Sequence, residues 1–263
     1  MAVGPLLKDW RRRRGLSQLD FAVRAQVSTR HLSYVETGRS VPSRELVLHL
    51  AELLEVPLRE RNGLLLAAGY APVFSARTLE DDASGMPYVR QAVSRLLASH
   101  EPYPALVKDR YWNVVDRNRS TEILLRGVDP DLLQPPINAL RMALHPDGMA
   151  PRIINLADWS GFLLRRLDHQ LLVSGDPALA SLAEEVRSYP GVSEPATVDP
   201  GQGEERVVVP LRLRHDGTEL CLLNMVATFG TAVDVTTAEL VIESFYPADD
   251  VTARVFGLAL TAS

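Results

Sequence analysis

Cationic and hydroxyl-bearing side chains gather in the first 69 residues of this 263-residue chain. The segment holds 11 Lys and Arg against 7 Asp and Glu, a net charge of +4, whereas the remainder has a net charge of −9. Arg11–Arg14 is a continuous basic run, and Ser28-Thr29-Arg30 places two hydroxyls beside a guanidinium. These groups donate hydrogen bonds to phosphate oxygens, and salt screens the acidic remainder beyond ~8 Å. The pattern therefore favours a phosphate-rich partner, with an ordinary solvated surface as the alternative.

The spacing of apolar residues predicts five short helices that carry these side chains. Ser17, Ser28 and Ser43 each stand where a helix begins, and Ser17 precedes Asp20 by three residues, as in a capping box. Gly15 and Gly38 are stop signals after the first and third helices. The inward faces are Leu6, Leu7 and Trp10; Phe21, Ala22 and Ala25; Leu32 and Val35; Leu46, Leu50, Leu53 and Leu54; and part of residues 58–68. We expect a compact all-α unit in which a tight turn joins the second and third helices.

Four motifs in this unit carry a resemblance to a known family. In order, they are Arg14-Gly15-Leu16-Ser17-Gln18, Val27-Ser28, Glu36-Thr37-Gly38-Arg39 and Pro42-Ser43. Residues 6 to about 68 resemble the XRE/Cro family of helix-turn-helix repressors. The resemblance implies that the third helix lies in the major groove of DNA.

Residue roles in DNA binding follow from this resemblance. Thr29, Arg30 and Tyr34 are implied to contact bases, since Arg bonds guanine bidentately and Thr meets the thymine methyl. Gln18, Ser28 and Arg39 are implied to hold phosphates, and His31 and Ser33 lie on the same helix. The alternatives are that Ser28 is only a cap and that Tyr34 packs on its own domain. Gln26 stands where the family usually has Gly, at a cost of ~1 kcal/mol for a left-handed conformation.

The rest of the chain reads as a second domain of α+β type. We expect a helix-turn-helix domain over 1–70, a polar linker over 71–88 and the second domain over 89–263, so the protein is multidomain. Asp216-Gly217 between alternating apolar residues is a strong hairpin signal. Strands are predicted at 105–108, 111–115, 207–214, 219–228 and 240–246, and helices at 89–99, 118–125, 156–172 and 177–189. Strands near both ends of the domain with helices between them favour an antiparallel sheet.

This second domain resembles the MmyB-like ligand-binding domain, which has a PAS-like fold. The likeness is carried by Tyr103–Val107, Trp112-Asn113 with Asn118, Leu140-Arg141 with Leu144-His145-Pro146, Asn155 with Trp159, Asp176-Pro177, Asp234-Val235-Thr236 and Glu243–Pro247. The resemblance implies a pocket between sheet and helices that binds a small apolar molecule, with fatty acids as the best-supported class.

The candidate ligand-binding residues divide into two groups. An acyl chain needs an apolar tunnel, and its carboxylate needs a charged or hydrogen-bonding partner. The apolar candidates are Trp112, Leu140, Met142, Trp159, Phe162, Leu163, Met225 and Phe229. The polar candidates are Arg141, His145, Arg152 and Asn155. The alternatives are a plain hydrophobic core for the first group, and surface charges or a loop histidine for the second.

Sequence features argue against an enzyme. The chain has no G-x-S-x-G, H-E-x-x-H or P-loop motif, and the lone Cys221 excludes a Cys-rich zinc site or an intrachain disulfide. We therefore expect no catalytic residues, no metal site and no cofactor other than a bound fatty acid or similar effector. No apolar run approaches the ~18 residues of a membrane span, and the N-terminus lacks a signal peptide pattern. We expect a cytoplasmic, nucleoid-associated protein.

Together these features predict a transcriptional regulator, a repressor, that binds a two-fold operator in double-stranded DNA as a homodimer and responds to a small apolar ligand. One alternative is a protein-interaction module that is tethered to DNA and has no small-molecule effector. A repressor without any effector is another alternative that the sequence leaves open.

Overall fold

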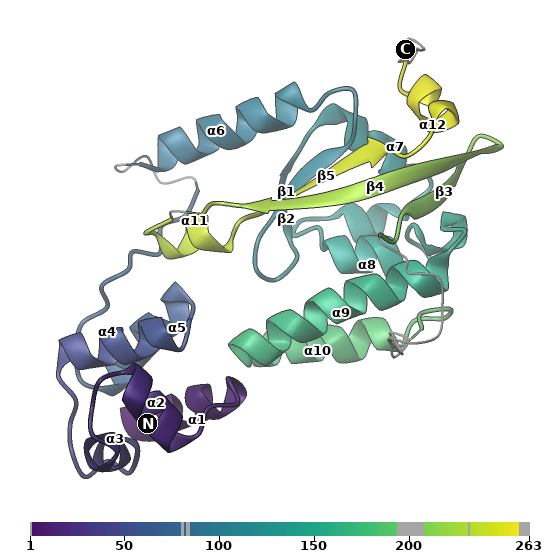
Figure 1. The fold of residues 1–263 in the computed structure, drawn as a ribbon. Helices are drawn as coiled ribbons and strands as arrows, with labels where there is room; N and C mark the ends of the chain where they lie inside the picture. Colours follow the sequence, from purple (N-terminus) through teal and green to yellow (C-terminus); the bar gives the residue numbers. More distant parts are fainter. Residues whose placement is uncertain (1, 80–81, 83–84, 194–207, 231, 258–263) are drawn as a thin grey trace. The chain divides into compact units, whose positions relative to one another are not determined.

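The computed structural model describes residues 2–79, 82, 85–193, 208–230 and 232–257 (Figure 1). They form two compact units. The first comprises the residues up to Thr78 with the short segments Leu172–Ser174 and 232–238, and the other described residues form the second. No helix within these ranges is both long and apolar enough to span a bilayer.

The first unit begins with the five predicted helices. They are α1 (Val3–Arg13), α2 (Gln18–Arg24), α3 (Thr29–Glu36), α4 (Arg44–Leu53) and α5 (Leu58–Ala67). The predicted caps are confirmed, because the hydroxyls of Ser17, Ser28 and Ser43 each accept a hydrogen bond from the amide three residues later, at 3.1, 3.1 and 3.2 Å. Gly15 and Gly38 take left-handed conformations where α1 and α3 end.

Most of the predicted inward faces form the core of this unit, but Leu6, Leu46 and Leu53 are only half-buried, and α4 buries Val47 and Ala51 instead. Leu7, Phe21, Leu32 and Leu50 are among the fully buried side chains of the unit. Helix α1 crosses close to the end of α3 at Gly4, where an added Cβ would lie 2.2 Å from the carbonyl oxygen of Val35. A glycine is therefore required at this crossing, which sequence analysis had not singled out.

The second unit contains a five-stranded antiparallel sheet of order β2-β1-β5-β4-β3. The strands are β1 (Ala105–Lys108), β2 (Val114–Arg117), β3 (Leu211–His215), β4 (Thr218–Thr228) and β5 (Val241–Pro247). The hairpin at Asp216-Gly217 is confirmed: both residues have positive φ, 47° and 78°, as its turn type requires. The prediction that β3 begins at 207 is wrong for Val208–Pro210, which form no strand, and residue 207 lies outside the described residues.

The first hairpin differs from the prediction of a strand over 111–115. The carboxylate of Asp109 accepts hydrogen bonds from the amides of Tyr111 and Asn113, at 2.8 and 2.9 Å, and so closes a loop before β2. Trp112 within that loop has a φ of 67°. Strand β2 therefore begins only at Val114, and the Trp112 side chain is buried.

Helices cover both faces of the sheet (Figure 1). Helix α6 (Met86–Ser99) packs on one face, where Val93 and Leu97 meet Ala105, Val107 and Ile242. On the other face lie α8 (Ala139–Leu144), α9 (Leu156–Ser174) and α10 (Pro177–Arg187), whose apolar residues share one core with those of β3 and β4. The remaining helices are α7 (Glu122–Leu125), α11 (Val235–Glu239), α12 (Asp250–Val255) and the 3₁₀ turns Arg119–Thr121, Pro130–Leu133 and Ala150–Arg152. We call the face toward α9 the inner face.

Candidate functional site

Helices α2 and α3 form the helix-turn-helix element. Gln26 in the turn between them has a φ of 54°, so the left-handed conformation expected there is present without glycine. Leu32 and Val35 are buried and hold α3 against the core. The opposite face of α3 is open to solvent.

The predicted DNA-contacting residues lie on that open face or at its ends. Ser28, Thr29, Arg30 and Arg39 are exposed, and His31, Ser33 and Tyr34 are half-buried. Arg30 Nε donates to Tyr34 Oη at 3.0 Å, and the guanidiniums of Arg30 and Arg39 lie 5.3 and 5.9 Å from the Tyr34 ring. Neither arginine is paired with a carboxylate of the described residues, so both charges are available to an anionic partner.

Gln18 lies beside the end of α3 rather than free in solvent. Its Nε2 donates to Glu36 Oε2 at 2.9 Å. Arg11 donates to the same carboxylate from Nε at 2.7 Å and Nη2 at 2.9 Å, and from Nη1 to the Leu16 carbonyl at 2.7 Å. The bond to Glu36 raises the pKa of Arg11 above its usual value. This buried network joins α1, α2 and α3 and was not anticipated from the sequence.

Within the basic run Arg11–Arg14, most side chains bond to groups of the same unit, and one is free in solvent. Arg13 pairs with Asp9, and Arg14 donates to the carbonyl oxygens of Leu54 and Glu55 at 2.8 and 3.1 Å. Arg12 is exposed and makes no hydrogen bond or ion pair with a described residue. Most of this run therefore stabilises the unit, which a count of charges does not reveal.

In the second unit, most of the apolar residues predicted to bind a ligand belong to the hydrophobic core. Trp112, Leu140, Trp159 and Leu163 are buried in the core beneath the inner face, with Phe162 packed at its edge. Met142 belongs to the same core, whereas Met225 is exposed and Phe229 packs with the cluster under α6.

The four polar candidates are each engaged by nearby protein groups. Arg141 forms a bidentate ion pair with Glu185, at 2.7 Å for both contacts, which lowers the pKa of that carboxyl. His145 accepts a hydrogen bond from the amide of Asp147 and packs against the Tyr189 ring. Arg152 donates to the carbonyl oxygens of Ile123 and Leu124. Asn155 donates to the carbonyl oxygen of Pro210 and accepts from the amide of Arg212. Arg141 and His145 meet around Glu185 and Tyr189, whose hydroxyl donates to Glu185, whereas Arg152 and Asn155 have separate partners among the described residues.

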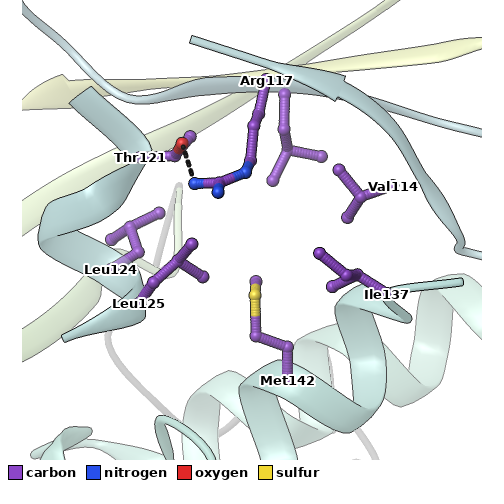
Figure 2. Close-up of a pocket in the computed structure, with 8 residues that line it drawn as sticks. Val114, Arg117, Thr121, Leu124, Leu125, Ile137 and Met142 are labelled. Atoms are coloured by element: carbon purple, nitrogen blue, oxygen red, sulfur yellow. Dashed lines mark hydrogen bonds between the residues drawn. The ribbon is translucent and has the colours of Figure 1, made fainter. Parts of the chain in front are cut away.

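A small apolar chamber lies between β1, β2, α7 and α8 (Figure 2). Its walls are Leu106, Val114, Leu124, Leu125, Ile137 and Met142, with Arg117 and Thr121 as its polar groups. Arg117 Nη1 lies 3.3 Å from Thr121 Oγ1 and donates to Glu122 at 2.7 Å. The free space is about 10 Å³, room for about one water molecule, so an acyl chain enters only if side chains such as Met142 move.

A buried charge cluster occupies the inner face beside this chamber. Lys108 Nζ and Arg166 Nη1 lie 2.8 and 2.7 Å from the same oxygen, Glu243 Oε1. The Lys108 and Glu243 side chains are 3% and 7% exposed. Burial lowers the pKa of Lys108 to about 7, because the carboxylate of Glu243 offsets only part of the desolvation cost. Trp112 covers the cluster, with its ring centroid 2.9 Å from Lys108 Nζ and 5.1 Å from the Arg166 guanidinium.

Neither the chamber nor the charge cluster was predicted from the sequence. Lys108 and Glu243 fell within predicted strands, and their alternation with neighbours could have placed them on one face. Their charges argued against burial, because lysine and glutamate are almost never fully buried unless paired. Among the described residues, no group of three or more His, Cys, Asp or Glu side chains is arranged to hold a metal ion.

Comparison with protein families agrees with the geometry of both units. Residues 2–64 match a helix-turn-helix domain, and residues 89–259 match the MmyB-like transcription regulator ligand binding domain. No curated protein matches the chain. The matched families are those of transcription regulators and not of enzymes. The chain therefore belongs to the family of DNA-binding helix-turn-helix regulators that carry an MmyB-like ligand-binding domain.

Proposed function

We propose that the protein is a sequence-specific repressor that binds a two-fold operator as a homodimer. The observation that carries this proposal is the exposed first turn of α3, where Thr29 and Arg30 follow the Ser28 cap. Thr29, Arg30 and Tyr34 would contact bases, with His31 and Ser33 beside them. Gln18, Ser28 and Arg39 would hold phosphates. The functional division is 1–70 for DNA binding, 71–88 as linker and 89–263 for ligand binding.

Arg30 is suited to base contact in its present conformation. Its Nε is bonded to Tyr34 Oη, whereas its two terminal nitrogens make no hydrogen bond with a described residue. The bidentate contact with guanine needs two such donors. Tyr34 therefore orients the guanidinium and leaves its donors available.

We expect a homodimer because a single helix-turn-helix copy would bind DNA weakly and recognise few base pairs. Non-specific DNA binding is typically only ~10⁻⁴ to 10⁻⁶ M, and one short helix contacts few base pairs. Two copies on half-sites about one helical turn apart supply the missing discrimination. Sedimentation of the free protein and of its complex with a two-fold duplex tests this: a single copy on the operator at saturation would reject the dimer.

The DNA-contact roles are tested with three arginine variants of the full chain. Arg30→Ala should weaken binding to the operator by ~1–3 kcal/mol and relax preference at one base pair. Arg39→Ala should weaken operator and random duplexes alike and flatten the salt dependence by about one unit of slope. Arg95→Ala, an exposed position on α6, is the control. Equal losses on operator and random DNA for Arg30→Ala would remove Arg30 from base recognition.

The second part of the proposal is that residues 89–263 bind a small apolar effector, with a fatty acid as the expected class. Each buried CH₂ of an acyl chain contributes ~0.8 kcal/mol, which supports affinity in an apolar lining. Mass spectrometry of lipid extracted from purified protein tests this part. No acyl species, together with no thermal shift from any fatty acid, would instead favour a protein-interaction module without an effector.

A further inference from the structure

Strand β4 is longer than the strand that pairs with one of its edges (Figure 1). On one side β4 pairs with β5 over Leu222–Thr228, whereas on the other side β3 pairs only with Thr218–Leu222. Val208 and Val209, which precede β3, form no strand and do not continue this pairing. Residues 223–228 therefore have an edge that pairs with no strand of the described residues. We call this stretch of β4 the open edge.

The main-chain groups that face outward here belong to alternate residues of β4. Phe245 is the cross-strand partner of Asn224, and its amide donates to the Pro104 carbonyl on the far side of β5, at 2.9 Å. The two residues of an antiparallel pair exchange both hydrogen bonds or none, so Asn224 directs its N–H and C=O away from β5. Val226 and Thr228 follow at intervals of two and point the same way. Such a row of unpaired groups is a template for another strand.

The side chains of the open edge do not block a further strand. Natural edge strands are commonly protected by lysine, proline or a bulge. The sequence of residues 223–228, Leu-Asn-Met-Val-Ala-Thr, has no charge and no proline, and its pairing with β5 contains no bulge. Met225 and Val226 are 60% and 46% exposed. The opposite edge of the sheet differs, because β2 carries Asp116 and Arg117 and pairs with β1 through an irregular register.

We propose that the open edge pairs with the same edge of a second copy, so that two sheets join across a two-fold axis at Val226. The inference rests on the proposed homodimer and specifies its interface. With Val226 opposite Val226 of the second copy, Asn224 lies opposite Thr228 of that copy, and Thr228 opposite Asn224. The outward-facing main-chain groups then form three residue pairs that each exchange two hydrogen bonds. Met225 lies opposite Ala227 on the other face of the joined sheet.

Charge and side-chain chemistry favour a second copy as the occupant. Residues 70–263 have a net charge of −9, so two copies repel each other at most other contacts. The open edge is uncharged and lets two such domains approach. Its cross-strand pairs also match in kind, since Asn224 meets threonine, Met225 meets alanine and Val226 meets valine.

Sedimentation equilibrium of the full-length protein tests the interface. Val226→Lys should weaken self-association at least tenfold, because it places two like charges directly opposite each other at the two-fold axis. Val115→Lys is the matched control, since Val115 is 39% exposed on β2 at the opposite edge of the sheet. Self-association lost in Val115→Lys but kept in Val226→Lys would overturn the proposal.

Mixing two charge variants separates a lost interface from a damaged fold. Val226→Glu alone should self-associate as weakly as Val226→Lys. An equimolar mixture should restore dimers of one copy of each, because the introduced lysine then faces the introduced glutamate. Native mass spectrometry distinguishes these mixed dimers by mass. Two well-folded variants that stay monomeric in the mixture would reject pairing at this position.

Cysteine variants test the register. The hydrogen-bonded pair at the two-fold axis has Cα atoms ~5.5 Å apart, within the range of a disulfide, so Val226→Cys should cross-link to its own copy on mild oxidation. Thr228→Cys should not, because its own copy lies four residues along the partner strand, at ~13 Å. Cross-linking of Thr228→Cys but not of Val226→Cys would overturn the register.

The remaining outcomes separate this inference from the proposed function. If Val226→Lys self-associates as tightly as the unaltered protein, the open edge is rejected and the homodimer is retained. If the unaltered protein is monomeric both free and on the operator, edge and homodimer are rejected together, while the arginine variants still decide on DNA recognition. If circular dichroism shows that Val226→Lys is unfolded, the cross-linking of the cysteine variants decides.

Discussion

The carboxylate of Glu36 provides a sharp test of how the helix-turn-helix element is held together. Replacing Glu36 by Leu removes the acceptor of two bonds from Arg11, at 2.7 and 2.9 Å, and of one bond from Gln18. The Arg11 side chain is only 9% exposed. An arginine guanidinium stays protonated in proteins even without an acidic partner, so Arg11 cannot escape the loss by becoming neutral. The variant therefore leaves a buried cation whose remaining bond is to the Leu16 carbonyl.

The expected cost is large. Removing one partner of a buried ion pair typically destabilises a protein by ~3–5 kcal/mol, against a total stability of ~5–15 kcal/mol for a domain. The double variant Arg11→Met/Glu36→Leu replaces the pair with apolar side chains of similar volume. It should recover most of the loss, to within ~1 kcal/mol of the unaltered chain.

Hydrogen exchange measured by mass spectrometry at increasing urea gives the free energy of opening for peptides within residues 2–67. Full-length protein is used, so the result reports on this unit in its own chain. We expect faster exchange in the single variant and near-normal exchange in the double variant. A single-variant loss below ~1 kcal/mol, or a double variant as unstable as the single, would refute a stability role for the buried pair.

Two further predictions concern packing and pH. Gly4→Ala should destabilise the first unit by ~1–3 kcal/mol, because the new Cβ meets backbone of α3, whereas Gly63→Ala, with nothing within 4 Å, should stabilise it by ~0.5–1 kcal/mol. Urea unfolding checks both, and a neutral Gly4→Ala would contradict the close crossing. The pKa of Lys108 is lowered to about 7, so between pH 7 and 9 the unfolded chain holds a proton that the folded chain has lost, and stability rises with pH. Lys108→Met should reduce that rise by up to about 2 kcal/mol, and an identical pH profile would rule out the lowered pKa.

Features with local causes were predictable from sequence. Ser17 and Ser28 cap their helices because a hydroxyl satisfies an amide three residues away, and this needs no distant partner. Asp216-Gly217 fixes its hairpin because both residues tolerate positive φ. The order of the five N-terminal helices and of the five strands was predicted from such signals together with apolar periodicity.

Some features that are set by a local side-chain cap were not predicted, because such a cap leaves no periodic signal. Asp109 delays β2 by capping a loop, although alternation alone favoured a strand from residue 111. The short helix α8 begins where the side chain of Asn138 accepts the amides of Leu140 and Arg141. Helices this short are too weak to leave a periodic signal.

For the candidate sites, the sequence was enough to predict the face of the proposed DNA contacts, because α2, α3 and their turn are contiguous and helical geometry alone places Thr29 and Arg30 together. The charge pairs of the second unit could be assigned only from the folded chain. Arg141, a candidate by type, is neutralised by Glu185, whereas Lys108, Arg166 and Glu243 converge from two strands and a helix. A charge interacts most strongly with its nearest neighbours, and for residues distant in sequence only folding fixes which residues those neighbours are.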